Sequence, residues 1–553
     1  MGCGRGSRTK MQPPVLVLNA QTKRETGRRA QMQNIVAGKA VADIIRTCLG
    51  PKAMLKMLLD TGGSIVITND GNSILREIDV SHPAAKSMID LARAQDDEVG
   101  DGTTSVVILA GEVLACVEPL IQKGMHPTII ISGMTKALDD IVDYCNTDAI
   151  GFTVDINNKE EMTKILKTCI GTKFTARWSD LLCQLALDAV MTVANEDNGF
   201  KEVDIKRFIR IEKIPGGNFE DSRVVRGCAV NKDVLHPQMK RRIENPRILL
   251  LDCPLEYKKG ESQTDVEVVN ADDFGALLKL EEDAIQQMCV DILKFKPDIV
   301  ITEKGLSDLA QHYLVKNGVT ALRRFRKTDT TRIGKACGAT IVSRTDEIEE
   351  KDIGTGCGLF EVKKIGDEYF SFFDNCKDPK ACTIILRGAS KDVLNELDRN
   401  IQDALCVAKN VVLNPRLVPG GGAVEMALAC HLNERAKSLE GVQHLPYRAV
   451  AEALEVIPRT LANNCGAKTV RVITELRAKH AADPQANSSW GIDGEAGVLA
   501  DMKAAGIWEP HVVKLQSVKS AVEAACLLLR VDDIISGVRG KKEGGGGGGG
   551  GGG

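Results

Sequence analysis

The pattern of apolar and polar positions divides the chain into three parts. Apolar residues recur at three- and four-residue spacing over 34–48, 84–99 and 106–117, which predicts helices in the first part. After residue 199, short β-rich runs such as 248–251 alternate with helical stretches such as 306–315. Beyond about residue 390 the helical pattern returns and continues to about residue 525. Two helical ends therefore flank an α/β middle part.

The length agrees with several folding units. At roughly 100–200 residues per domain, the 553 residues correspond to about three or four domains. No tandem repeat of fixed period is present, so a solenoid is not indicated. The two helical ends have a similar loop-and-helix pattern, which suggests that they pack together with the middle part inserted between them.

The two termini are expected to be disordered tails. Residues 1–10 are rich in glycine and basic side chains but lack the apolar core of a secretory signal. Residues 544–553 are all glycine, which has no side chain to bury and the most backbone entropy to lose. We expect disorder over about 1–15 and 541–553.

Composition and charge exclude several classes of protein. No uninterrupted apolar run approaches the ~20 residues of a membrane span, so no membrane partner is expected. The 72 basic and 75 acidic side chains nearly cancel to a net charge of -3, which argues against a nucleic-acid partner. The 17 cysteines are scattered, with neither Cys-x-x-Cys pairs nor histidines at metal-ligand spacing. A reduced, cytoplasmic environment fits best.

Glycine-containing loops carry the candidate chemistry. The sequence lacks the Gly-x4-Gly-Lys-Ser/Thr phosphate loop, and 354–358 lacks the dinucleotide-binding spacing. The run 100–105 combines glycines, hydroxyls and a helix start, which suits an anion, and its Asp101 could bind Mg²⁺. For this run alone, a helix capped by Thr or Ser is the simpler interpretation. The loops 49–52, 68–71 and 419–422 would each be ordinary turns in isolation.

Three further patterns have local explanations. Asp403 follows Arg399 by four residues, which on a helix predicts a solvated ion pair between them. Residues 273–275, Asp-Phe-Gly, imitate a kinase motif, but no His-Arg-Asp loop accompanies them. Cys376 and Cys382 lie six residues apart and are close enough to bridge in principle, although reduced thiols are the default in the cytosol.

Considered together, the loops match a known family in order and spacing. The matching runs are Leu49-Gly50-Pro51-Lys52, Ile67-Thr68-Asn69-Asp70-Gly71, Gly100-Asp101-Gly102-Thr103-Thr104-Ser105, Asp403-Ala404-Leu405 and Gly420-Gly421-Gly422. They resemble the chaperonins over nearly the whole chain, and within them the group II chaperonins. The chain is most similar to one subunit type of the eukaryotic cytosolic chaperonin (TRiC/CCT), on residues 18–25 and 463–469.

The resemblance implies a multidomain α and α/β fold, the chaperonin fold. Its parts would be a mostly helical equatorial ATP-binding domain (1–145 and 404–553), a hinge-like intermediate domain (146–214 and 371–403), and an α/β apical, substrate-binding domain (215–370) with a helical lid protrusion at about 253–283. This order agrees with the three parts of the apolar pattern.

The resemblance also implies a site for ATP and Mg²⁺. The cofactor-binding residues would be Leu49, Gly50, Pro51, Asp101, Gly102, Thr103, Thr104, Ser105, Lys173, Gly421, Gly422 and Glu509. Asp101 would bind Mg²⁺, Lys173 would sense the γ-phosphate, and Glu509 would meet the ribose hydroxyls. Gly421 and Gly422 would lie where a side chain would clash with the nucleotide.

Two carboxylates would be catalytic. By the same resemblance, Asp70 and Asp403 would flank the attacking water, with Asp403 as the general base. Asp403 belongs to the intermediate segment rather than to the phosphate-binding loops. Hydrolysis would therefore require closure of the hinge, which couples the state of ATP to the apical domain.

The implied function is that of an ATP-hydrolysing, protein-folding chaperonin subunit. Its partners would be seven paralogous subunits in each of two stacked eight-membered rings, non-native clients such as actin and tubulin, and co-chaperones such as prefoldin. Clients would touch the polar face of the helix predicted over 305–316, namely Ser307, Asp308, Gln311, His312 and Lys316.

Two other functions remain open, and the sequence departs from the family's pattern at one place. A small-molecule kinase could use the same loops, and a scaffold could bind ATP without hydrolysing it. The family's Gly-Pro-Lys-Gly-Met-Asp-Lys run is replaced at 50–56 by Gly-Pro-Lys-Ala-Met-Leu-Lys, so nucleotide binding or turnover is expected to be weaker.

Overall fold

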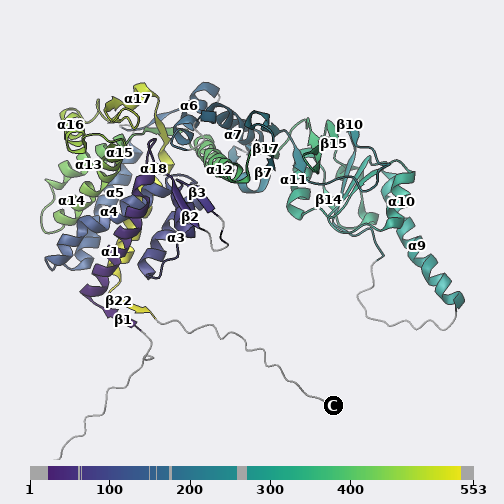
Figure 1. Ribbon diagram of the computed structural model, residues 1–553, viewed down its shortest axis with the longest axis horizontal. Coiled ribbons are helices and arrows are strands. Elements are labelled where there is room, and N and C mark those ends of the chain that lie inside the picture. The colour runs from purple at the N-terminus through teal and green to yellow at the C-terminus, as the bar shows by residue number, and fades with distance from the viewer. Residues whose placement is uncertain are drawn as a thin grey trace, which may run out of the picture.

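The structure, a computed structural model, describes residues 23–59, 63, 65–147, 150–156, 158–173, 177–197, 199–257 and 271–536. They form three bodies in a row (Figure 1), which we call the helical body, the middle body and the α/β body. The expected tails at 1–15 and 541–553 lie outside the described residues, as does the part of the expected protrusion over 258–270.

The helical body combines both ends of the chain. Its N-terminal elements are β1 (Lys23–Thr26), α1 (Arg28–Ile45), the 3₁₀ turn η1 (Arg46–Cys48), β2 (Lys56–Leu59), β3 (Ile65–Thr68), α2 (Gly71–Glu77), α3 (Pro83–Glu98), α4 (Thr103–Gln122) and α5 (Pro127–Asn146). Its C-terminal elements are α13 (Ala423–Ala436), α14 (His444–Leu454), α15 (Val456–Asn464), α16 (Thr469–Ala482), β19 (Trp490–Ile492), β20 (Leu499–Asp501), α17 (Met502–Ala505), α18 (His511–Arg530) and β22 (Asp533–Ser536). One apolar core contains residues from both sets, so the expectation that the two ends pack together agrees with this core.

Helix α4 lies at the centre of this body. It packs against α1, α14 and α18, and its side chains from Val106 to Ala110 are fully or almost fully buried. By length and composition α4 could cross a membrane, but most of its apolar stretch is buried in the core. Glu112 and Glu118 interrupt its apolar residues, so α4 does not contradict the expectation that no uninterrupted apolar run approaches the length of a membrane span.

The middle body is built from three chain segments. Its elements are β4 (Phe152–Thr153), α6 (Lys159–Ile170), α7 (Ser179–Val193), β5 (Asn195–Asp197), β6 (Phe200–Glu202), α8 (Ile205–Phe208), β7 (Ile209–Pro215), the 3₁₀ turn η3 (Phe219–Asp221), β8 (Arg223–Val225), β17 (Cys382–Gly388), α12 (Lys391–Leu413), β18 (Arg416–Pro419) and β21 (Trp508–Pro510). The Ser390 hydroxyl caps α12 by accepting from the Val393 N–H. Leu394, Leu397 and Ile401 recur at helical spacing and are buried against α6 and α7.

The α/β body contains a parallel sheet of order β13-β12-β11-β14 and an antiparallel sheet of order β10-β15-β16-β9. Its elements are β9 (Cys228–Val230), β10 (Arg242–Glu244), β11 (Ile248–Leu251), α9 (Ala271–Lys294), β12 (Ile299–Thr302), α10 (Asp308–Lys316), β13 (Thr320–Leu322), α11 (Lys327–Cys337), β14 (Ile341–Val342), the 3₁₀ turns η4 (Thr345–Glu347) and η5 (Glu350–Asp352), β15 (Leu359–Ile365) and β16 (Glu368–Asp374). Every residue of β11 and β12 is buried, as in a parallel sheet that is covered on both faces. Helix α9 projects from the end of this body (Figure 1).

One local expectation fails in the α/β body. The helix predicted from residue 305 begins at Asp308, because Ser307 is its N-cap and accepts a hydrogen bond from the Ala310 N–H. Cys376 and Cys382 are both free, which agrees with the expected default of reduced thiols, and the Cys382 Sγ lies 3.7 Å from the Ala189 carbonyl oxygen.

Candidate nucleotide site

A cavity of about 510 Å³ lies between the helical body and the middle body. Its size is within the usual range of small-molecule sites. All of the residues that were expected to hold the nucleotide or to act on it line this cavity: Leu49, Gly50, Pro51, Asp70, Asp101, Gly102, Thr103, Thr104, Ser105, Lys173, Asp403, Gly421, Gly422 and Glu509. Segments separated by hundreds of residues therefore meet in one place.

The N-terminus of α4 opens into this cavity. Gly102 is its N-cap with φ of 75°, and no side chain among the described residues caps the helix there. The interpretation of this run as a helix capped by Thr or Ser is therefore wrong. The Asp101 Oδ1 instead accepts from the Gly102 N–H at 2.7 Å. Free N–H groups and the positive end of the helix dipole make this terminus suited to a phosphate group.

Asp70 is held in place by local hydrogen bonds. It caps α2, where its Oδ2 accepts from the Ser73 N–H at 2.9 Å, and its Oδ1 accepts from the Thr103 hydroxyl at 3.2 Å. Burial by itself would raise the pKa of Asp70, but the Lys173 ammonium and these hydrogen bonds outweigh it and hold the pKa below its ordinary value. Asp70 is therefore a carboxylate with fixed orientation.

Asp403 faces the same cavity from α12. Its Oδ2 accepts a hydrogen bond from the Lys173 Nζ at 2.6 Å, and both side chains are less than one-fifth exposed. Arg399 pairs with Glu396 at 2.8 Å instead. The predicted pair between Arg399 and Asp403 is therefore wrong, because α12 turns Asp403 toward the inside of the molecule.

Burial sets the protonation of Asp403. It raises the pKa of this carboxyl to about 8, and the neighbouring carboxylates of Asp70 and Asp101 act in the same direction, whereas the Lys173 ammonium opposes them. A carboxyl with such a pKa can accept a proton near neutral pH, which is the property that a general base needs.

The glycine loop before α13, residues 420–422, packs closely against other parts of the protein. Gly421 and Gly422 have φ of 62° and 77°. A Cβ on Gly422 would lie 2.9 Å from the Pro458 Cβ, and one on Gly421 would lie 2.5 Å from the Met502 Sδ. Glycine is thus required here by backbone conformation and by close neighbours in the protein, a reason that differs from the expected clash with a nucleotide.

Glu509 belongs to a buried group of charges that the sequence did not reveal. Lys514 Nζ lies 2.6 Å from Glu425 Oε1 and 2.9 Å from Glu509 Oε2. Glu425 and Lys514 are 2% and 11% exposed at their side chains. Lys514 follows Glu509 by five residues, but Glu425 comes from α13, so the three meet only because both α13 and α18 pack against β18.

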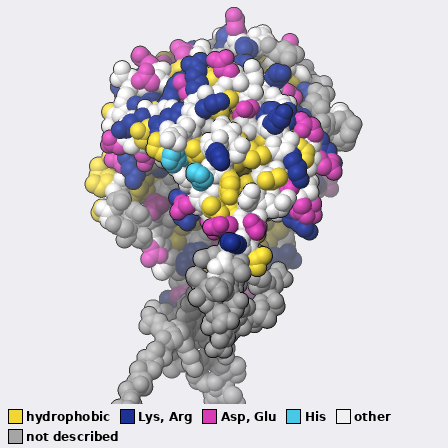
Figure 2. Space-filling model, turned by 90° about the vertical axis from the view of Figure 1, so that its right-hand side faces the viewer, with side chains coloured by type: hydrophobic (Ala, Val, Ile, Leu, Met, Phe, Trp, Pro, Cys, Tyr) yellow, Lys and Arg dark blue, Asp and Glu magenta, His cyan; other side chains and the backbone are white. Residues whose placement is uncertain are grey.

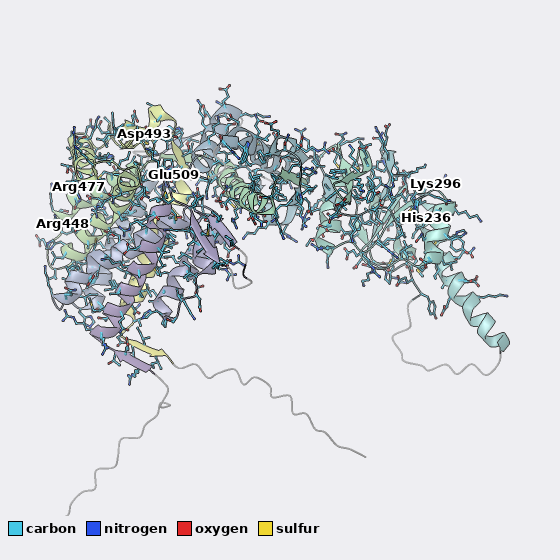
Figure 3. The ribbon with its side chains drawn as sticks, viewed as in Figure 1. His236, Lys296, Arg448, Arg477, Asp493 and Glu509 are labelled. Carbon is cyan, nitrogen blue, oxygen red and sulfur yellow. The ribbon has the colours of Figure 1, made fainter. Side chains whose placement is uncertain are left out.

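Other residues of the cavity wall also escaped sequence analysis. Ile457, Leu461 and Ile492 give it an apolar side, and Asp493 a polar one. In Figure 3, Asp493 and Glu509 lie near each other, toward the boundary between the helical body and the middle body. These side chains belong to ordinary helical and strand patterns, so no local signal distinguishes them.

The residues expected to touch clients lie on α10, far along the chain from this cavity. Asp308, His312 and Lys316 are exposed, whereas Ser307 and Gln311 are half-buried. The opposite face of α10 is buried in the core of the α/β body. Figure 2 shows this end of the molecule, where acidic and basic side chains are interspersed with apolar ones.

Comparisons with known proteins agree with this architecture. The model of the TCP-1/cpn60 chaperonin family matches residues 41–539. The chain is 62% identical to the T-complex protein 1 subunit gamma of Xenopus laevis over 96% of both chains. It is 60% identical to the subunit gamma of Schizosaccharomyces pombe, over 96% of this chain and all of the other. It is also 62% identical to that of Drosophila melanogaster, over 96% of both.

These matches confirm the expected multidomain α and α/β chaperonin fold, and they fall on the subunit type that residues 18–25 and 463–469 indicated. The similarity extends over nearly the whole length of the relatives rather than over one domain. The chain therefore belongs to the TCP-1/cpn60 chaperonin family.

Proposed function

We propose that this chaperonin chain binds ATP with Mg²⁺ in the cavity described above and hydrolyses it to drive protein folding. One observation carries the proposal: Asp70, Asp101, Asp403 and Lys173 converge with the free N-terminus of α4 in one cavity. Hard oxygen ligands, a cation and helix N–H groups are the groups that a magnesium-bound triphosphate needs.

Each group has a definite task. Asp101 would hold Mg²⁺, while the α4 N–H groups and the Lys173 ammonium would hold phosphate oxygens. Magnesium-bound ATP supplies the terminal phosphoryl group that passes to water. Asp403 would take the proton of that water, and Asp70 would orient it from the opposite side. Glu509 would contact the ribose hydroxyls.

The nested domains are part of the same proposal. Residues 1–145 and 404–553 would act as the equatorial domain, 146–214 and 371–403 as the intermediate hinge, and 215–370 as the apical domain. Asp403 lies on α12, whose core belongs to the middle body, whereas the phosphate-facing loops come from the helical body. A hinge motion between them would assemble and separate the catalytic groups.

We further propose that the chain assembles with seven paralogous subunits in each of two stacked eight-membered rings in the cytoplasm. The β2–β3 hairpin supports an assembly interface, because Met57 and Leu59 are 70% and 74% exposed and Ile65 is 55% exposed. Clients such as actin and tubulin would contact the exposed polar side of α10, and co-chaperones such as prefoldin would deliver them.

The catalytic assignment is tested with Asp403→Ala in the full chain. We expect ATP turnover to fall about 10²–10⁴-fold while ATP binding persists. Asp398→Ala is the matched control, because Asp398 lies on the same helix but pairs with Lys213 at 3.0 Å and does not line the cavity. Unchanged turnover in the Asp403→Ala chain would remove the assignment.

The kinase and scaffold alternatives have less support. Residues 273–275, which imitate a kinase motif, fall in the first turns of α9, which belongs to the α/β body. A scaffold that only binds ATP has no use for a buried carboxyl with a raised pKa beside a lysine. Turnover without a phosphorylated acceptor would separate the proposed function from a kinase.

A further inference from the structure

Three buried cysteines of the α/β body converge at one point. The Sγ atoms of Cys337, Cys357 and Cys376 all lie within 4.8 Å of one another, and the three side chains are buried. This is the one group of at least three potential metal ligands found among the described residues. It is remote from the nucleotide cavity, whose lining contains none of the three.

Strand register explains why two of the thiols meet. Strands β15 and β16 pair with Leu359 opposite Asp374. Continuing this register by two residues places Cys357 opposite Cys376, at the open end of the hairpin. Directly opposite residues of an antiparallel pair bring their side chains close together.

Backbone hydrogen bonds bring in the third thiol. Cys337 is the last residue of α11, and its carbonyl oxygen accepts from the Gly356 N–H at 3.0 Å. The Gly356 carbonyl oxygen in turn accepts from the Lys377 N–H at 3.0 Å. A Cβ on Gly356 would lie 2.9 Å from the Cys337 carbonyl oxygen, and one on Gly358 would lie 2.6 Å from the Asn375 carbonyl oxygen. Glycines on both sides of Cys357 therefore permit the close approach that joins the three segments.

We propose that Cys337, Cys357 and Cys376 form a binding site for a soft monovalent cation, Cu(I), in trigonal coordination. A metal–sulfur distance of about 2.3 Å in a planar three-sulfur site places the sulfurs about 4.0 Å apart, and these already lie within 4.8 Å. Soft thiolates select Cu(I). Structural Zn²⁺ prefers four ligands, and no fourth His, Cys or carboxylate side chain among the described residues joins the group.

Copper binding exchanges the thiol protons, and a neighbouring cavity gives access to the group. Each sulfur that binds releases its proton to solvent as the Cu–S bond forms, and copper stays in the Cu(I) state. Arg226 and Lys377 line a cavity of about 470 Å³ that Cys376 also lines, which gives the cation a path inward and cationic side chains near a negatively charged site.

The test measures Cu(I) affinity of the reduced full chain under anaerobic conditions, in competition with the chelator bicinchoninate. We expect one tightly held Cu(I) per wild-type chain, with three sulfur neighbours in X-ray absorption spectra. Cys357→Ala should weaken binding at least about 100-fold, beyond the effect of removing a group that only orients a ligand. Cys289→Ala is the matched control, because Cys289 is equally buried in the same body but outside the group.

Several results would overturn the proposal. One is a wild-type chain that holds no Cu(I) in competition with the chelator. Another is a Cys357→Ala chain that binds Cu(I) as tightly as the wild type. A third is binding of Zn²⁺ through a fourth ligand that is tighter than the binding of Cu(I). Circular dichroism and ATP binding would establish that Cys357→Ala folds. If Cys357→Ala does not fold, the same Cu(I) affinity is measured for Cys337→Ser, which removes another of the three ligands.

Discussion

The nucleotide cavity and the three-cysteine group are both buried and both assembled from distant segments, but opposite chemistry holds them together. In the cavity, charged groups have charged partners, as Lys173 has Asp403 and Lys514 has Glu425 and Glu509. In the α/β body, three weakly polar thiols meet. Buried charges are costly when they lose a partner, whereas a thiol behaves much like a small apolar side chain. The two regions should therefore respond very differently to the loss of one member.

The largest effect is expected for Lys514→Met. It leaves the buried carboxylate of Glu425 and the half-buried carboxylate of Glu509 without a cation, and breaking a buried pair costs about 3–5 kcal/mol of the free energy of unfolding. Urea denaturation of the full chain measures it. The control is Lys519→Met on the exposed side of the same helix α18, where a change within about 0.5 kcal/mol is expected. Equal effects of the two changes would contradict the comparison.

A smaller loss is expected for Gly422→Ala. The added Cβ meets the Pro458 Cβ at 2.9 Å on a backbone with φ of 77°, so stability should fall by about 1–3 kcal/mol and ATP binding should weaken. Gly441→Ala separates the two causes, because Gly441 has φ of 88° but no neighbour within 4 Å of an added Cβ. If both variants lose the same stability, close packing around Gly422 contributes nothing.

The charge pairing in the cavity can be examined through pH. In the proposed mechanism hydrolysis requires ionised Asp403, whose pKa burial raises to about 8 against the opposing effect of the Lys173 ammonium. Removing that cation by Lys173→Met raises the pKa further, so the acid limb of the pH–rate profile should move to higher pH by about 1–3 units. Turnover measured from pH 6 to 10 would show it. An acid limb that stays in place, or moves to lower pH, would contradict this electrostatic account.

The smallest effect is expected for Cys357→Ala without added metal. The change leaves no buried charge behind, so the free energy of unfolding should fall by no more than about 1 kcal/mol. The same urea denaturation applies, with 1 mM reductant and a metal chelator present. A loss as large as that of Lys514→Met would show that the three thiols stabilise the α/β body even when they are empty of metal.

The sequence predicts local structure best where a signal depends on near neighbours. The pattern of 248–251 predicted β11 with the bounds observed, and the helices predicted over 84–99 and 306–315 match α3 and α10 within about two residues. The start of α4 was less well predicted, because its N-cap is Gly102 with a left-handed backbone rather than a hydroxyl side chain. Preferences that act between neighbouring residues do not indicate which close contacts with distant segments a glycine permits.

The cysteines show a limit of the same kind. Their spacing in the sequence gave no metal-ligand pattern, yet three of them meet in space. The register of β15 and β16 and the end of α11 decide that meeting. A search for short-range cysteine motifs cannot detect a site in which each ligand comes from a different element.

The sequence by itself determined the positions of the helices and strands, the glycine loops and the family to which the chain belongs. Only the tertiary structure decided the partners of the buried groups: Lys173 with Asp403 across 230 positions, and Lys514 with Glu425 across 89. The physical reason is that apolar periodicity and turn preferences act over a few residues, whereas the pairing of buried charges is fixed by the way that whole helices pack.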